Sequence, residues 1–131
     1  MRPVSLIIFP YTTLFRSLPD SFNKIEGWED SWLVIGDISS NPIIVDVSDE
    51  KTPVYIALHG VGSWQLKQIA RSFEDFIVFL CYWIEKVLNK FYGNLIDDDC
   101  VLRSKVLKVI MKCMSKSIDE EFHSNFLEFI E

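Results

Sequence analysis

His59 is the residue best placed for acid–base chemistry, because it follows an apolar, alternating segment and begins the sequence HGVG. As a general base it would need a carboxylate partner, and Asp37, which follows another apolar segment, is the candidate. Such a pair would make the chain a hydrolase. The chain has no G-x-S-x-G nucleophile motif, however, and Gly60 and Gly62 equally suit a tight turn beside a structural histidine. We therefore predict no catalytic residue and no enzyme activity.

The three cysteines do not have the spacing of a metal site. Cys81, Cys100 and Cys113 are scattered without a CxxC pair, so we expect no zinc site from them with His59 or His123. Cys81 lies in an apolar run and Cys113 lies on a helical pattern. We expect both to be buried thiols in a reducing compartment, which predicts a cytoplasmic protein.

Three consecutive acids, Asp97 to Asp99, lack the alternating ligands and the glycine of a calcium loop. We expect them instead to lie at the positive N-terminus of a following helix. The chain has no GxGxxG and no Walker loop, so no phosphate-binding motif is present. We therefore predict no metal and no cofactor.

The central apolar region of the chain predicts three strands near 32–37, 42–47 and 53–59. These strands would position Asp37 and His59. In the last two, apolar and mixed residues alternate, which is typical of half-buried strands. The linking segments DISSNP and SDEKTP are short and rich in turn residues, which predicts antiparallel neighbours. The segment WQLKQIA (64–70) fits either a short fourth strand or a loop.

Three helices are expected after this region. Ser72 is the predicted N-cap of a core helix over 73–90, whose apolar residues recur at helical spacing. A second, basic helix is predicted over 101–114, and a capping box from Ser117 to Glu120 would begin the last helix. The last helix would dock through the apolar residues Phe122, Phe126, Phe129 and Ile130. The predicted fold class is therefore α+β, with a central, mostly antiparallel sheet.

The charge balance limits the partners. Thirteen basic and nineteen acidic residues give a net charge of −6, which argues against a nucleic-acid binder. An acidic surface suits a basic protein partner, although solubility alone also explains it. The apolar run FIVFLCYWI is too short to span a membrane. The basic helix over 101–114 suits a membrane surface or a partner helix, but acids at 119–131 facing it within the chain are the favoured explanation.

The first seventeen residues, MRPVSLIIFPYTTLFRS, are unlike the rest of the chain. An arginine before an apolar stretch suggests a secretory leader, but Pro10, Thr12 and Thr13 interrupt the stretch. Residues 9–17, FPYTTLFRS, resemble the translation of a common sequencing-library adapter. We therefore expect 1–17 to be a non-native artefact and 18–131 to be a single, N-terminally truncated domain.

A succession of short patterns in the central region resembles the SUKH superfamily of Smi/Knr-like proteins. The matching segments span roughly 18–80 and are IGD at 35–37, the strand at 42–46, PVY at 53–55, IA at 69–70 and SFEDF at 72–76. The resemblance implies an α+β fold with a largely antiparallel sheet. Gly36, Trp64 and Phe73 are matched positions that look structural, and the resemblance assigns no partner-binding residues.

The resemblance also implies a role. Bacterial members are mostly immunity proteins of polymorphic toxin systems, which bind a toxin domain, often a nuclease, inside the producing cell and neutralise it without chemistry. An acidic surface would fit the basic groove of a nuclease. The alternative is a regulatory or scaffold module of the same fold, as in the fungal relatives. We expect the protein to bind a toxin domain, and neither nucleic acid nor a membrane.

Overall fold

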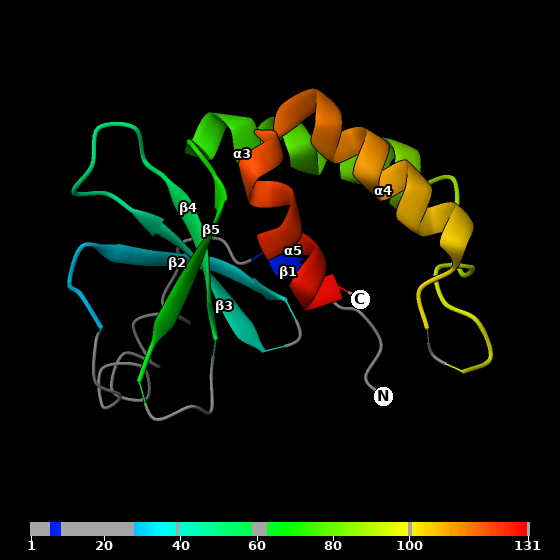
Figure 1. Cartoon of the computed structure of the whole chain (residues 1–131), viewed down its shortest axis with the longest axis horizontal. Helices are drawn as coiled ribbons and strands as arrows, with labels where there is room; N and C mark the ends of the chain where they lie inside the picture. Colours follow the sequence, from blue (N-terminus) through cyan, green and yellow to red (C-terminus); the bar gives the residue numbers. More distant parts are fainter. Residues whose placement is uncertain (1–5, 9–27, 39, 59–62, 100, 131) are drawn as a thin grey trace.

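The structure is a computed structural model that describes residues 6–8, 28–38, 40–58, 63–99 and 101–130 (Figure 1). Its centre is a five-stranded sheet in the order β1-β2-β3-β4-β5, in which every neighbouring pair is antiparallel. The strands are β1 (Leu6–Ile8), β2 (Trp32–Ile38), β3 (Asn41–Asp46), β4 (Val54–Leu58) and β5 (Gln65–Ala70). The three predicted strands and their antiparallel pairing are confirmed, and 64–70 proves to contain a strand.

The first strand lies within the segment that we expect to be an artefact. Its backbone pairs with the end of β2, with Leu6 opposite Ile38 and Ile8 opposite Gly36. This pairing does not test the origin of residues 1–17, which stays a prediction. Sequencing an independently prepared copy of the gene would test it, and a copy that still encodes FPYTTLFRS would refute it.

The helices gather on one side of the sheet (Figure 1). They are α3 (Phe73–Tyr82), a π-helical continuation η1 (Trp83–Leu88), α4 (Ser104–Ser117), a 3-10 turn η2 (Glu120–Phe122) and α5 (His123–Ile130). The predicted core helix and the two further helices are therefore confirmed. The predicted cap is also confirmed, since the N–H of Asp75 donates to Ser72 Oγ at 3.1 Å.

One large core joins the sheet to the helices. The strands contribute residues such as Ile43, Val45 and Ile56, all of which are buried. From the helices, the Phe79 ring meets Phe126 edge-on with centroids 5.0 Å apart, so α3 and α5 share this core. Burial of aromatic side chains of this size is the dominant favourable term in folding.

The opposite face of the sheet carries a smaller apolar cluster. Because side chains alternate along a strand, Ile44 points away from its neighbours Ile43 and Val45 and packs with Trp64. Trp28 contacts Trp32 and Trp64 edge-on, at centroid distances of 5.3 and 5.5 Å. These three tryptophans are therefore packing residues of this cluster.

Four expectations about the helices are wrong in detail. The basic helix begins at Ser104 and not at 101, so its first turn holds none of the three aspartates. Instead, Asp97 Oδ1 accepts the N–H groups of Asp99 and Val101, at 2.9 and 3.0 Å, and folds the loop before the helix. A short polar side chain that can bond to its own loop competes with a helical start.

The predicted capping box is also wrong. Ser117 is the last residue of α4, and its hydroxyl donates to Cys113 O at 2.8 Å. Asp119 occupies the N-cap position of the next turn, without a side-chain cap bond. A serine hydroxyl in the last turn of a helix can donate to the carbonyl one turn earlier. The hydroxyl is then not available to cap the next helix.

Among the described residues, no acid after α4 forms an ion pair with a lysine of that helix. Asp119 pairs with Arg71 at 3.8 Å and Glu128 pairs with Lys67 of β5. Asn125 of α5 also donates to Gln68 O at 2.8 Å, which fixes α5 to the same strand. The acids therefore stabilise the docking of α5 on β5, and the basic face of α4 stays open.

The prediction of two buried thiols holds for one of them. Cys113 is buried in the core, whereas Cys81 is exposed. Ile77 and Ile84 next to Cys81 on the same helical stripe are exposed as well, at 39% and 52%. The apolar run is longer than one helix face can bury, so the side away from the sheet remains apolar.

Candidate partner-binding surface at the acidic end of the sheet

Acidic side chains gather where β2 begins, β3 and β4 are joined, and α3 begins. The N–H of Val47 donates to Ser31 O at 3.0 Å, which brings the residues before β2 beside the β3–β4 connection. The N–H of Asp46 donates to Pro53 O at 3.1 Å and closes the base of that connection. Segments that are distant in sequence therefore form one surface.

The β3–β4 connection is held by its own acidic side chains. Asp46 Oδ1 accepts the N–H of Ser48 at 3.0 Å and its hydroxyl at 2.6 Å. Asp49 Oδ1 accepts the N–H of Lys51 at 2.9 Å. Such bonds from an aspartate to the backbone two residues later are typical of turns. They give the exposed loop a defined shape.

Thr52 ties this loop to the first turn of α3. Its φ of 50° lies in the left-handed region, which a β-branched residue rarely adopts. Its N–H donates to Asp49 O at 2.9 Å, and its hydroxyl donates to Lys51 O at 2.7 Å. The same hydroxyl oxygen accepts the N–H of Phe73 at 3.3 Å. These bonds offset the backbone strain and hold the loop against the helix.

This end of the sheet carries many more acidic than basic side chains. Arg71 is already paired, with Asp75 at 3.7 Å and with Asp119 at 3.8 Å. Lys51 is the remaining basic side chain of the described loop. The acidic side chains here, none of which has an ion-pair partner among the described residues, are Glu29, Asp30, Asp46, Asp49, Glu50 and Glu74.

The pKa values of Asp46 and Tyr55 are shifted at this end of the sheet. The hydrogen bond from the Ser48 hydroxyl lowers the pKa of Asp46 below 3.8, so this carboxylate keeps its charge. Partial burial raises the pKa of Tyr55 above 10.0, and the charges of Asp46 and Asp49 raise it further. The surface therefore presents negative charge at neutral pH.

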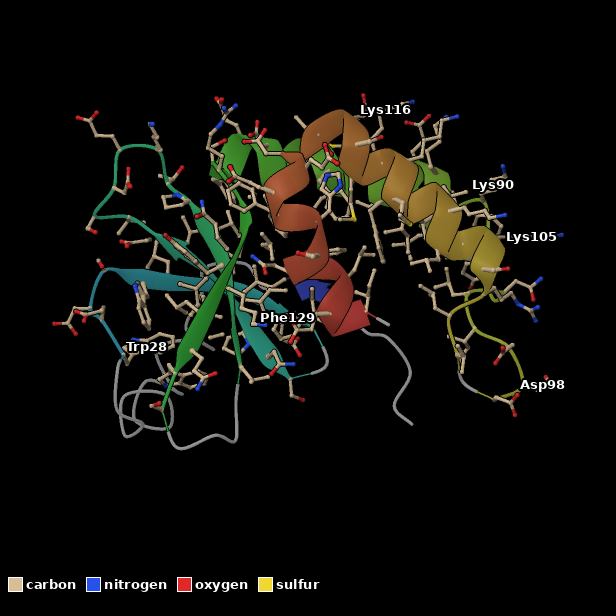
Figure 2. All side chains as sticks on the ribbon, viewed as in Figure 1. Trp28, Lys90, Asp98, Lys105, Lys116 and Phe129 are labelled. Atoms are coloured by element: carbon tan, nitrogen blue, oxygen red, sulfur yellow. The ribbon has the colours of Figure 1, made fainter. Side chains whose placement is uncertain are left out.

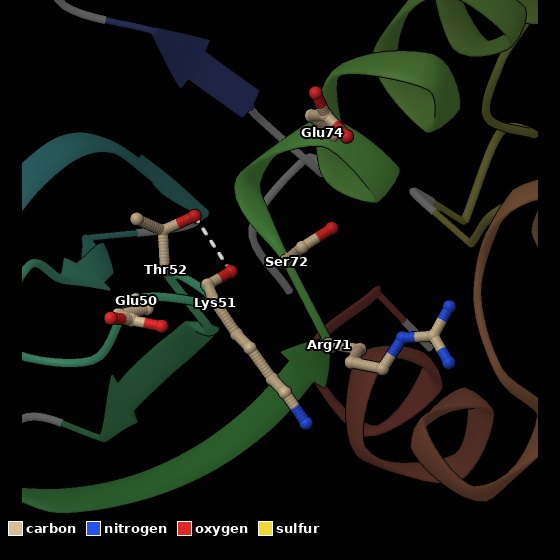
Figure 3. Close-up of a pocket in the computed structure, with 6 residues that line it drawn as sticks. All are labelled: Glu50, Lys51, Thr52, Arg71, Ser72 and Glu74. Carbon is tan, nitrogen blue, oxygen red and sulfur yellow. Dashed lines mark hydrogen bonds between the residues drawn. The ribbon is translucent and has the colours of Figure 1, made fainter.

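A cleft of about 500 Å³ opens between the loop and the start of α3. Figure 3 shows Glu50, Lys51 and Thr52 on the loop side, with Arg71 and Ser72 across from them. Its lining is polar and charged, which suits a charged side chain of a protein partner better than an apolar small molecule.

The structure does not test whether His59 and Asp37 could form an acid–base pair, because His59 and the rest of HGVG lie outside the described residues. Asp37 lies near the end of β2, and Leu58 ends β4 at the same edge, with the start of β3 between them. The Oδ2 atom of Asp37 accepts the N–H of Ser40 at 2.8 Å. Its Oδ1 atom is buried without a partner among the described atoms.

The other candidate ligands are also dispersed. Cys100 lies outside the described residues, and His123 contacts Ile118 O through Nε2 at 2.8 Å. Within the described ranges, no three His, Cys, Asp or Glu side chains are grouped to hold a metal ion. In the same part of the chain, no helix has both the length and the apolar composition required for a bilayer crossing.

Sequence reasoning missed this surface because it read SDEKTP only as turn chemistry. The acids of that segment were visible, but their proximity to Glu29, Asp30 and Glu74 depends on the pairing of strands. A cluster of acids in every connection at one end of a predicted antiparallel sheet is the signal that could have found it.

Comparison with known proteins identifies the family of the chain. The model of the SMI1 / KNR4 family (SUKH-1) matches residues 5–78, more than half of the chain. The match covers the sheet and the first part of α3. No curated protein and no solved structure matches the chain.

Proposed function

The chain belongs to the SMI1 / KNR4 family (SUKH-1), and we propose that it is a non-enzymatic immunity protein. The family consists of immunity and protein-interaction domains. In this proposal the protein binds a cognate polymorphic toxin domain inside the producing bacterial cell and occludes it. Neutralisation would need a rigid, complementary surface and no chemical step.

The acidic end of the sheet is the observation that carries the proposal. Three of its carboxylates, those of Asp46, Asp49 and Glu50, belong to the β3–β4 connection. Hydrogen bonds made by Asp46, Asp49 and Thr52 hold this connection in one shape. A preorganised loop loses little conformational freedom on binding, and a concentrated charge speeds the encounter with a basic partner. A nuclease toxin, whose groove must be basic to bind phosphates, fits these properties best.

Co-expression with the toxin encoded beside this gene tests the proposal. The protein should restore growth of cells that make the toxin, and the two chains should co-purify. The Asp49→Asn/Glu50→Gln variant keeps the hydrogen-bond acceptors but removes two charges. We expect its association rate to fall about tenfold at low ionic strength.

The matched control is Asp98→Asn/Asp99→Asn, which makes the same charge change in an exposed loop before α4. It should protect cells and associate like the unmodified protein. Equal slowing by both variants would show that net charge, and not the acidic end, guides binding. A complex without protection would favour the regulatory or scaffold alternative. An outcome with neither protection nor a complex would reject the immunity function.

A further inference from the structure

A second charged surface, of opposite sign, lies between η1 and α4. It is a groove of about 280 Å³, and the side chains that give it charge are four lysines. Lys86 comes from η1 and Lys90 from the turn that follows, while Lys112 and Lys116 lie one helical turn apart on α4. Figure 2 labels Lys90 and Lys116, which belong to the helical layer and not to the acidic end.

The lysine charges are mostly uncompensated. Within the described part of the chain, the one ion pair of the four joins Lys86 to Glu85 at 3.2 Å. Lys116 lies over the Tyr82 ring at 5.6 Å, which orients its ammonium group at the groove. The first three turns of α4 hold no acidic residue, since the helix sequence is SKVLKVIMKCMSKS.

The rest of the lining is apolar or aromatic, and consists of Tyr82, Val109 and Cys113. Burial raises the pKa of the Cys113 thiol, although the charges of Lys116, Lys86 and Lys112 act in the opposite direction. The thiol is therefore a neutral, apolar part of the lining at neutral pH. A ligand for this groove must combine negative charge with a small apolar group.

The size of the groove and the charge of the whole chain decide between ligands. A long polyanion such as nucleic acid would be repelled by a chain of net charge −6, whose acids outnumber its bases elsewhere. A short acidic segment needs only the local field, which is effective within about 8 Å at physiological salt. A groove of about 280 Å³ also holds only a few side chains.

We propose that the groove between η1 and α4 binds an acidic peptide segment, carrying an apolar side chain, of a protein partner. The segment would place carboxylates beside Lys86, Lys112 and Lys116 and its apolar side chain against Val109 and Cys113. This site is separate from the acidic end of the sheet, so the protein has two interaction surfaces of opposite charge.

Fluorescence anisotropy tests this proposal with the full chain and a labelled glutamate-rich peptide that contains one leucine. Binding should be measurable at low ionic strength, and Lys112→Gln/Lys116→Gln should weaken it about tenfold. Glutamine is a good helix former, so the variant should keep α4. The matched single variants are Lys112→Gln, in the groove, and Lys108→Gln, which lies on the same helix and outside the groove.

The proposal requires that Lys112→Gln weakens peptide binding and that Lys108→Gln does not. Equal weakening by both variants would mean that net charge, and not the groove, determines binding, and this result would overturn the proposal. A peptide that fails to bind the unmodified protein would also overturn it. Tighter binding of a single-stranded DNA oligonucleotide of equal charge would assign the groove to nucleic acid instead. The probe is not the toxin, so these results are independent of the proposed immunity function.

Discussion

Asp46 shows how a single carboxylate shapes the candidate surface. It lies at the end of β3 and accepts two hydrogen bonds from Ser48, which fix the first step of the β3–β4 connection. The folded chain therefore stabilises the charged form of Asp46 more than the unfolded chain does. That difference makes the stability of the protein depend on pH.

We expect Asp46→Asn to lower the free energy of unfolding at pH 7 and to matter less in acid. The folded pKa of Asp46 is lowered from 3.8, so its stabilising contribution is present above that pH. The contribution is lost as the pH falls through the folded pKa. Urea unfolding of both proteins across this range measures the difference.

The same experiment in a Ser48→Ala background supplies the control. The Ser48 hydroxyl is the largest cause of the lowered pKa of Asp46, so the pH-dependent difference should largely disappear there. An unchanged difference between acid and neutral pH would contradict this account.

The two described cysteines should differ in reactivity. Cys81 is exposed, whereas Cys113 is buried and its pKa is raised by that burial. Only the thiolate reacts quickly with alkylating agents. In a Cys100→Ser background, iodoacetamide should therefore modify Cys81 in the folded protein and Cys113 only after unfolding. Mass spectrometry of the labelled peptides distinguishes the sites, and fast native labelling of Cys113 would contradict its burial.

Sequence patterns predict residues best when the local chain alone determines their role. Ser72 was predicted correctly because an N-cap depends on the next three residues. Cys81 was predicted to be buried because its neighbours are apolar, but which side of a helix faces the sheet depends on the other helices. For the same reason Ser117, which looks like a cap in sequence, instead completes the helix before it.

At the scale of elements, α3 depends on its cap. Ser72→Ala removes the acceptor for the Asp75 N–H, and we expect a loss of about 1 kcal/mol in the free energy of unfolding. Ser115→Ala is the matched control, since the Ser115 hydroxyl donates to Lys112 O within α4, on the exposed side of that helix. Alanine favours a helix interior, so this control should be neutral or slightly stabilising. Equal losses in thermal or urea unfolding would argue against the cap.

Alternating patterns predicted the strands well because each strand buries one regular set of side chains. For β5 the sequence does not decide between a strand and a loop, since QLKQIA alternates only weakly. Its place at the sheet edge, covered by α5 through Asn125 and Glu128, supplies the rest of its stabilisation. Contacts from residues 57 and 61 positions later cannot be predicted from a local pattern.

At the scale of the whole molecule, the family match ends inside α3, but the core does not. Ten of the eighteen residues in the main core cluster follow residue 78. They come from α3, η1, α4, the following turn and α5, and are Phe79, Trp83, Val87, Val106, Ile110, Cys113, Met114, Ile118, Phe126 and Ile130. The sheet therefore needs the carboxy-terminal helices to cover its face.

We expect a chain that ends at residue 78 not to fold cooperatively. It would expose the apolar side of β3, β4 and β5, and a sheet must bury its apolar face against another layer to form a stable domain. Circular dichroism during urea unfolding should show no cooperative transition, while the full chain shows one. A cooperative transition in the shortened chain would mean that the matched region is an independent folding unit.

The π-helical segment η1 has a consequence for changes in chain length. Phe79, Trp83, Val87 and Phe91 recur every four residues, and a spacing of four overshoots an α-helical turn by about 40°. The wider turn of η1, in which the Asn89 N–H donates five residues back to Ile84 O, corrects this overshoot and keeps the four side chains in line. A π turn is what an α-helix becomes when it accepts one additional residue. Homologues that lack one residue between positions 83 and 88 should therefore have an uninterrupted α-helix here, with the same apolar row against the core.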